Sequence, residues 1–336
     1  LSRAAVRDVN NFLSQPTGNG PFQIAEPWGP GESVTLEAFP GFIETPDLAG
    51  IRFLAYPDAA ASWVDFVRGE LDVAEVPAGQ IRDAEERFGT DGFKPFLKSE
   101  YYGFNLRSPA LQKVALRKAV NRAIDRREIA RTIFKGTLAP PRGLVPTGMP
   151  GFQENICVQM CNHAPRTARS LVKRLEPKAR RVVLEYTKGG LQREVALFVA
   201  RDLRAAGLRV AVKGFRFPAF LRRLRAGDHA VYRLGWIAEY PVPDAFLTPL
   251  FESTSPDNHS GFASAKVDAL LAEARRSSSD GKRLQLYIEA EKAIMRSVPV
   301  VPLGSFETHW AAQNDVRRLR FDVMGGFDAA EVFLAP

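Results

Sequence analysis

The sequence predicts an α/β protein with two lobes. Two observations support this fold class: the size and composition of the chain, and the order of its strand-like and helix-like segments. With 336 residues, 45% of them apolar and 25% charged, the chain can bury a sizeable core that is better divided between two lobes than held in one. Segments with the period of a strand alternate with segments at helical spacing, which is typical of α/β lobes.

The residue pattern between positions 22 and 76 predicts a hairpin, followed by a strand, a helix and another strand. The hairpin is expected over residues 22–39, because two β-prone segments flank the Gly-Pro-Gly turn at 29–31. The strand, helix and strand are expected over residues 51–76. The inward face of that helix is predicted from i, i+3, i+4 spacing to hold Trp63, Phe66 and Val67.

Two consecutive helices are predicted in the middle of the chain. The first is expected over residues 108–124, because a Ser-Pro pair supplies an N-cap and a helix-ready first residue before apolar residues recur at helical spacing. Asp125 and Glu128 form a capping-box pattern for the second helix. Gly136 stands where a left-handed C-terminal cap is expected.

The next part of the chain alternates strands with helices. In an α/β lobe of this kind, ligands gather beyond the carboxyl ends of the strands, and this rule points to residues 235–244. The expected strands are 182–185, 208–212 and 230–234, and the helices between them are 191–206 and 217–225. Helices at 265–275 and 282–297 and a buried strand at 298–303 follow.

Composition and motifs exclude several functions. The net charge of +8 comes from basic residues on the polar sides of amphipathic helices, without interleaved aromatic residues, so we expect no nucleic-acid partner. No segment reaches the ~18 consecutive apolar residues of a membrane helix. The four histidines show no paired spacing, and no nucleophile elbow, CxxC pair or nucleotide loop is present. We therefore expect no enzyme, no metal and no cofactor.

The two cysteines, Cys157 and Cys161, lie four positions apart, and His163 follows two residues later. A local disulfide is the favoured interpretation, and it fits an oxidising, extracytoplasmic location. Free thiols and a metal site remain alternatives, although zinc sites usually have two-residue cysteine spacing and a fourth ligand.

Three segments carry a family resemblance: residues 119–129, which contain AIDRREI, residues 136–152, GTLAPPRGLVPTGMPGF, and residues 231–251, VYRLGWIAEYPVPDAFLTPLF. In this order they resemble the AxxAIDRxxI, GxxxPxxGLVPxxxPGF and GWxADYPDPxxFLxxLF signatures of the extracellular solute-binding proteins, family 5. This family serves ABC importers of oligopeptides, dipeptides and nickel.

The resemblance implies a two-lobe periplasmic-binding-protein-like fold of type II, cluster C. Family members carry further chain ahead of the point that residue 18 matches, so we expect a sequence truncated at the N-terminus and a first lobe that is incomplete. Residues 1–98 are then part of lobe I, residues 99–305 form the C-terminal α/β lobe, and residues 306–336 return to lobe I.

The resemblance also implies a ligand site on the third segment. Gly235 lets a ligand approach the backbone, Trp236 offers a flat wall, and the acid at 239 anchors the α-amino group in peptide-binding members. Here the family's Asp is Glu239, and Val242 replaces a second acid, which leaves the ligand class open.

Other residues complete the candidate site. Arg233 matches an arginine that lies near the ligand carboxylate in some peptide binders, and Tyr102 and Asn105 are secondary candidates near the crossing between the lobes. The alternatives are a solvated acid or an interlobe ion pair for Glu239, and a core position for Trp236. Asp244 is expected to cap the helix 245–250 rather than contact ligand.

The resemblance therefore predicts the non-enzymatic, substrate-binding component of an ABC importer. It would be a monomer that binds peptides or peptide-like solutes and delivers them to the transmembrane subunits of a permease. Its expected location is extracytoplasmic, with a lipid anchor in the full-length form. The alternative is a regulatory or scaffold module that senses a solute within a larger protein.

Overall fold

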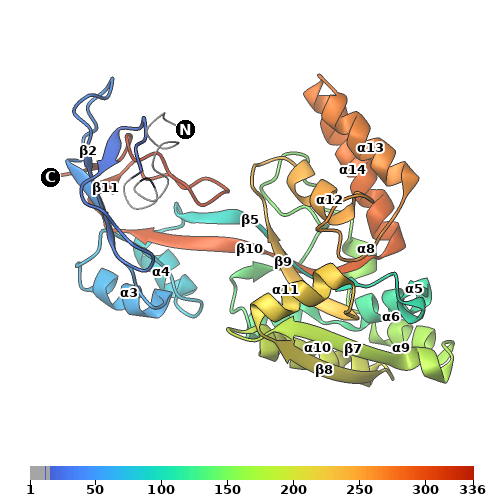
Figure 1. Ribbon diagram of the computed structural model, residues 1–336. Helices are drawn as coiled ribbons and strands as arrows, with labels where there is room; N and C mark the ends of the chain where they lie inside the picture. The colour runs from blue at the N-terminus through green and yellow to red at the C-terminus, as the bar shows by residue number, and fades with distance from the viewer. Residues whose placement is uncertain (1–11, 13–15) are drawn as a thin grey trace. The chain divides into compact units, whose positions relative to one another are not determined.

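The computed structural model describes residues 12 and 16–336 and divides into two compact units (Figure 1). Unit 1 contains the described residues up to Lys94 together with Thr308–Pro336, and unit 2 is Pro95–Glu307. The chain passes between the units inside two strands, β5 (Phe93–Phe104) and β10 (Val300–Ala312), and both strands contribute residues to each unit.

Unit 1 contains the predicted hairpin, and β2 pairs antiparallel with both β1 and β3. The end of β10 pairs antiparallel with β4, and α3 and α4 pack beside this pair. The elements are β1 (Phe22–Ile24), β2 (Val34–Ala38), β3 (Gly50–Phe53), α3 (Ala59–Val67), β4 (Val73–Glu75), α4 (Ile81–Phe88), β11 (Val316–Arg317) and β12 (Phe333–Leu334).

The core of unit 1 is a small aromatic cluster. Trp63 stacks on Phe66 with ring centroids 5.0 Å apart, and Phe88 meets both rings edge-on. Two of the three residues predicted to face inward on α3 are thus buried. The prediction for Val67 is wrong: its side chain is 44% exposed, because it stands at the last position of the helix, beyond the cluster.

Unit 2 is built on a mixed sheet in which the strands run in the order β10, β5, β9, β7, β8. β7 is parallel to β8 and β9, whereas β5 is antiparallel to β9. α10 packs on β7 and β8, and α11 contacts β7 (Figure 1). The strands in addition to β5 and β10 are β6 (Leu138–Ala139), β7 (Arg181–Thr187), β8 (Arg209–Phe215) and β9 (Val231–Ile237).

The helices of unit 2 include those predicted from the sequence, with shifts of a few residues at their ends, except that the helix expected over residues 108–124 is divided into two. They are α5 (Pro109–Gln112), α6 (Val114–Ala123), α7 (Arg126–Thr132), α8 (Val158–Cys161), α9 (Pro165–Lys173), the 3₁₀ turn η1 (Pro177–Arg180), α10 (Gln192–Ala205), α11 (Phe217–Ala226), α12 (Asp244–Phe251), α13 (Ala265–Arg276) and α14 (Asp280–Ser297). No helix in the described ranges has both the length and the hydropathy needed to span a membrane.

Local signals account for several helix ends. The Asp125 side chain accepts the Glu128 N–H at 3.0 Å and caps α7, as predicted. Gly207, which follows α10, has a φ of +97°, and Gly227 ends α11 in the left-handed region. The helical spacing of Leu191, Val195, Phe198 and Leu203 predicts that these four residues face inward, but Leu191 is 40% exposed, so the prediction is wrong for this residue.

The single helix predicted over residues 108–124 is broken at Lys113, whose ψ of 105° separates α5 from α6. The break leaves carbonyls without intrahelical partners. Arg117, four residues later and buried, donates to the carbonyls of Leu111 and Gln112. The Arg117 side chain thus supplies donors to the carbonyls that the break leaves without partners, and so the interruption is tolerated.

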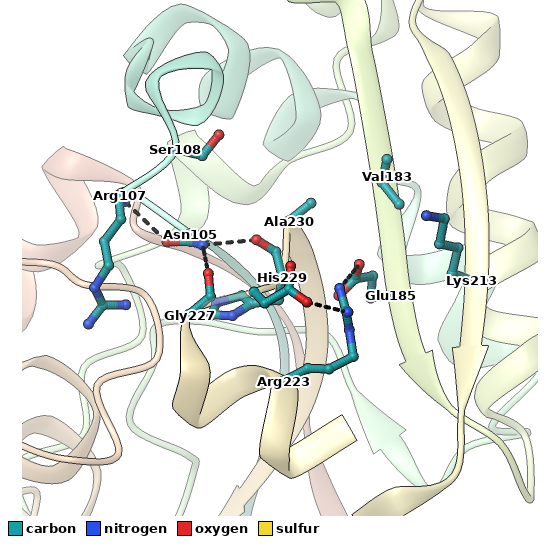
Figure 2. Close-up of a pocket in the computed structure, with 11 residues that line it drawn as sticks. Asn105, Arg107, Ser108, Val183, Glu185, Lys213, Arg223, Gly227, His229 and Ala230 are labelled. Carbon is teal, nitrogen blue, oxygen red and sulfur yellow. Dashed lines mark hydrogen bonds and ion pairs between the residues drawn. The ribbon is translucent and has the colours of Figure 1, made fainter. Parts of the chain in front are cut away.

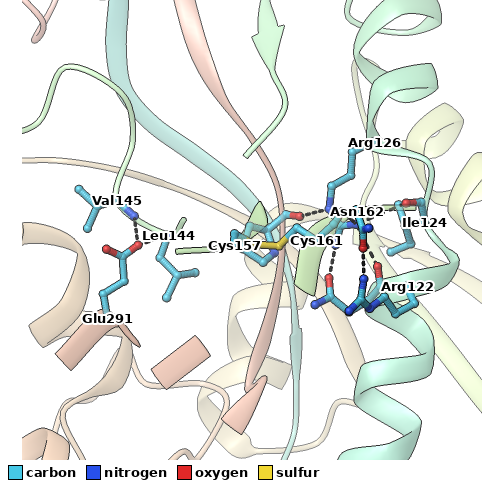
Figure 3. Close-up of a disulfide and its surroundings, with 11 residues drawn as sticks. Arg122, Ile124, Arg126, Leu144, Val145, Cys157, Cys161, Asn162 and Glu291 are labelled. Atoms are coloured by element: carbon cyan, nitrogen blue, oxygen red, sulfur yellow. Dashed lines mark hydrogen bonds between the residues drawn. A yellow bond between two sulfur atoms is a disulfide. The ribbon is translucent and has the colours of Figure 1, made fainter. Parts of the chain in front are cut away.

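Arg126 is the second buried arginine of this region. At 3% exposure it donates to the backbone carbonyls of four residues, of which Figure 3 labels Cys161 and Ile124, and burial lowers the pKa of its guanidinium to about 9. The acceptors are Pro302 O at 2.6 Å, Cys161 O at 2.8 Å, Asn121 O at 2.9 Å and Ile124 O at 3.3 Å. The guanidinium therefore links β10, α6 and the end of α8.

Cys157 precedes α8 and Cys161 is its last residue, and the structure joins them by a disulfide with Cα atoms 5.3 Å apart (Figure 3). His163 Nδ1 lies 3.1 Å from the Asp125 carboxylate. In the described part of the chain, no cluster of three or more His, Cys, Asp or Glu side chains has a metal-binding arrangement.

Titration of the thiols tests this arrangement. We expect to find no free thiol in denatured, unreduced protein, because the two sulfurs are bonded to each other. After reduction, the two thiols of Cys157 and Cys161 should be detected. Closing so short a loop adds only ~2 kcal/mol in the chain-entropy model, so a Cys157→Ser, Cys161→Ser variant is expected to fold. Free thiols in unreduced protein, or stoichiometric zinc, would contradict the disulfide.

Candidate functional site

The predicted ligand residues lie on and just beyond β9, whose partner is β5. The antiparallel register sets Tyr102 opposite Arg233, and Glu100 opposite Gly235. Because side chains alternate along a strand, Arg233 and Gly235 share one face of the sheet with Glu100 and Tyr102, whereas Trp236 points to the other face.

Trp236 is held in place by its indole N–H, which donates to Ala245 O at 2.6 Å. The ring is half-buried, and its anchor lies in the first turn of α12. Gly235 lies close to the Glu100 carboxylate: a Cβ at 235 would come within 3.0 Å of Glu100 Oε1. A side chain at 235 would therefore press on the Glu100 carboxylate, and the predicted role of Gly235 in ligand approach stays a prediction.

Glu239 lies in the turn between β9 and α12, where its side chain is exposed. Among the described residues, no hydrogen bond or ion pair to its carboxylate is present. The strand-end rule and the family motif thus both lead to an acid that is open to solvent. This arrangement suits an anchor for a cationic group, and it is also compatible with the simpler role of a solvated acid.

The prediction for Asp244 is wrong, because its side chain caps no helix. Asp244 is the first residue of α12, and the cap position is occupied by Pro243. Its carboxylate instead accepts hydrogen bonds from Tyr240 at 2.9 Å, Thr248 at 2.6 Å and Tyr287 at 2.9 Å. Burial, the hydrogen bond to Asp244 and its charge raise the pKa of Tyr240 to about 12.

Arg233 is 4% exposed and forms an ion pair with Glu100, with Nη2 and Oε2 at 3.0 Å. Sequence reasoning singled out Arg233 but missed Glu100. A signal was present, since Glu100 is the one acid of β5, a strand whose other charged residues are Lys94 and Lys98. The pairing itself depends on the register of β5 and β9, which the sequence does not show.

Asn105 and Tyr102 are both buried in unit 2. Asn105 Nδ2 donates to Gly227 O and His229 O, each at 2.9 Å, and its Oδ1 accepts the Arg107 N–H at 3.1 Å. These bonds tie the end of β5 to the loop before β9. Tyr102 is fully buried, its hydroxyl has no hydrogen-bond partner among the residues that the structure describes, and burial raises its pKa.

Unit 2 also contains a pocket of about 380 Å³ at the opposite end of β9 from Glu239 (Figure 2). Arg223 crosses its wall, donating to Glu185 at 3.2 Å and to Asp228 at 2.6 Å. Burial lowers the pKa of His229, another lining residue, to about 4. Arg223 pairs with both acids of this pocket, and Glu185 Oε2, Arg223 Nε and His229 Nδ1 have no hydrogen-bond partner among the described residues; we base the candidate site on the motif at the other end of β9.

The fold is that of the two-lobe periplasmic binding proteins. HbpA2 from Haemophilus parasuis superposes with a TM-score of 0.83 at 22% identity, covering 99% of this chain and 67% of that one. Helicobacter pylori DppA in complex with the peptide STSA superposes with a TM-score of 0.78 at 21% identity, covering 100% of this chain and 68% of that one.

The chain belongs to the bacterial extracellular solute-binding proteins, family 5, whose model matches residues 4–258. It is 29% identical over 295 residues to the probable deoxycholate-binding periplasmic protein YgiS of Escherichia coli, covering 85% of this chain and 55% of that protein. The Escherichia coli dipeptide-binding protein is 22% identical over 324 residues, covering 92% and 60%. OppA of Bacillus subtilis, an oligopeptide-binding protein, is 24% identical over 314 residues, covering 89% and 57%.

The chain thus spans a little over half the length of these curated relatives. Their names describe solute-binding proteins rather than enzymes, and this agrees with the absence of catalytic motifs from the sequence.

Proposed function

We propose that this protein is the substrate-binding component of an ABC importer and takes peptides or peptide-like solutes. The observation that carries the proposal is the exposed carboxylate of Glu239, which has no partner among the described residues and stands at the motif position where peptide-binding members place their amino-group anchor. The family match and the peptide-binding relatives support it. The regulatory alternative is less favoured, because the relatives are binding proteins of the transport type.

In this proposal Trp236 and Glu239 contact the ligand, and unit 2 is the C-terminal lobe, while unit 1 belongs to lobe I. Closure of the lobes on the ligand would link binding to delivery to the transmembrane subunits of a permease. We place the protein outside the cytoplasm, in line with the description of the family as extracellular and the name of YgiS as periplasmic, and as a monomer with a lipid anchor. Tyr102, Asn105 and Arg233 remain predicted ligand residues.

Native mass spectrometry of the full-length protein, purified without denaturation, tests the proposed ligand class. A co-purified peptide or peptide-like solute, displaced by unfolding, would support it. Because one relative is named for deoxycholate and Glu239 and Val242 depart from the usual motif, calorimetry should compare short peptides with deoxycholate. If the protein binds deoxycholate and none of the peptides, the proposed ligand class is wrong.

Glu239→Gln is expected to weaken peptide binding about 30-fold, which corresponds to ~2 kcal/mol, because the ligand ammonium loses its counter-ion on closure. Calorimetry with free and N-acetylated peptides measures the effect, and acetylated peptides should bind the two proteins equally. Glu154→Gln is the matched control, since Glu154 is an exposed acid of the same unit with no ion pair in the described structure. Equal affinity of the wild-type protein and Glu239→Gln for free peptides would place the anchor elsewhere.

A further inference from the structure

A buried pair of charges lies next to the strand end that carries the predicted ligand residues. Arg233 and Glu100 are each 4% exposed, and their closest atoms are 3.0 Å apart. In the described part of the chain, Glu100 Oε2 and Arg233 Nε have no hydrogen-bond partner, and neither has the nearby Tyr102 hydroxyl. The cost of burying these two charges is therefore offset largely by their mutual attraction.

The position of Glu100 along the strand controls access to Arg233. Glu100 stands opposite Gly235, which is two residues closer than Arg233 to the end of β9. Its Oε1 fills the space that a side chain at 235 would need. A ligand group that approaches Arg233 along this face from the strand end therefore meets the Glu100 carboxylate first.

Arg233 and Arg223, another arginine of unit 2, differ in the number of acids that they contact. Arg223 contacts the buried Glu185 at 3.2 Å and also Asp228 at 2.6 Å, so it keeps an anionic partner if either acid is lost. In the described structure Glu100 is the acid in ion-pair contact with Arg233. Removing Glu100 would leave Arg233 buried and uncompensated, which is strongly unfavourable.

We propose that Glu100 is a built-in counter-ion that takes the place of a ligand carboxylate on Arg233. The ligand part of this inference rests on the proposed function: the site at the end of β9 accepts solutes with an amino group for Glu239 and needs no carboxylate at their other end. Peptide amides and related amines are then ligands as good as free peptide acids. Lys98, the next cation on this face, is already placed over the Phe306 ring at 4.2 Å.

Chemical rescue tests the counter-ion without knowledge of the ligand. Glu100→Ala removes a side chain whose end has the shape of acetate. Acetate is expected to raise the melting temperature of this variant by about 3 °C at ten times its dissociation constant, whereas isosteric, neutral acetamide is not. If the variant unfolds without acetate, the yield of refolding with acetate or acetamide gives the same comparison.

The controls isolate Arg233. Wild-type protein and Glu185→Ala should show no difference between acetate and acetamide, because Arg223 retains Asp228. Glu100→Ala combined with Arg233→Met should lose the rescue while remaining folded, since it removes both charges. Equal effects of acetate and acetamide on Glu100→Ala, or rescue that persists in the double variant, would overturn the inference.

Calorimetry with paired peptide acids and amides tests the ligand part. Wild-type protein should bind both forms within a factor of about three, and Glu100→Ala should prefer the free acid by at least about tenfold. A tenfold preference of wild-type protein for free acids would overturn the proposed ligand class. If no peptide of either form binds any variant, the proposed function fails, and the acetate comparison still decides whether Glu100 is the counter-ion.

Discussion

Replacing Arg126 with Met is expected to lower the free energy of unfolding of unit 2 by about 4 kcal/mol. The substitution preserves much of the side-chain volume but removes every donor. The carbonyls of Pro302, Cys161 and Asn121 then stay buried without a partner, and each such group costs ~1–3 kcal/mol. Denaturant titration followed by circular dichroism measures the loss on the transition of unit 2.

Two further variants separate the hydrogen bonds from the charge. Arg127→Met changes the next residue of α7, which is exposed, and should alter stability by less than ~0.5 kcal/mol. Arg126→Lys keeps a positive charge but has no planar fork of donors, so its loss should fall between the two Met variants. A loss below ~1 kcal/mol for Arg126→Met would show that water or neighbouring groups satisfy the carbonyls.

The elements that could be predicted from the sequence are those with local causes. Asp125 caps α7 through a residue three positions away, and Gly207 and Gly227 end helices because glycine adopts the left-handed region at little cost. The hairpin of β1 and β2 follows from its turn residues. Each of these signals lies within a few residues of the structure that it produces.

The wrong predictions concern features that depend on residues distant in the sequence or on side-chain packing. No glycine or proline marks the break at Lys113, which depends on the reach of the Arg117 side chain. Asp244 has the sequence signature of an N-cap, but Tyr287 on α14 occupies its carboxylate. The same limit applies to the candidate site. The motif located Glu239, whereas the partner of Arg233 emerged only from the pairing of β5 with β9.

Glu291 makes a contact between residues distant in the sequence whose effect on stability can be measured as a function of pH. It lies on α14 at 2% exposure, and its Oε1 accepts the backbone N–H groups of Leu144 at 2.6 Å and Val145 at 3.0 Å (Figure 3). Burial raises the pKa of its carboxyl from 4.5 to about 7, against the opposing effects of these two hydrogen bonds and of the Lys292 charge. Gly143 precedes the clamped loop, and a side chain there would collide with the carboxylate.

This buried acid is expected to make the protein less stable as the pH rises from about 4.5 to about 7. In that range the folded chain holds a proton on Glu291 that the unfolded chain releases, so protonation favours folding at the acidic end and the advantage is lost through the folded pKa. The loss is on the order of 3 kcal/mol for a shift of this size. Glu291→Gln keeps an oxygen that accepts both N–H groups but cannot titrate, and the fall in stability should therefore be smaller in this variant by that amount.

Denaturant titrations at pH 5, 6, 7 and 8 compare the wild-type protein with the variant, and the difference between the two profiles removes the contributions of all other titrating groups. Glu289→Gln, an exposed position on the same helix, should follow the wild-type profile. If Glu291→Gln were as pH-dependent as the wild type, the carboxyl would have to titrate alike in the folded and unfolded chains. Because a dry, desolvated carboxyl cannot do so, that result would mean that water reaches Glu291 and that the Leu144 and Val145 loop is held by other contacts.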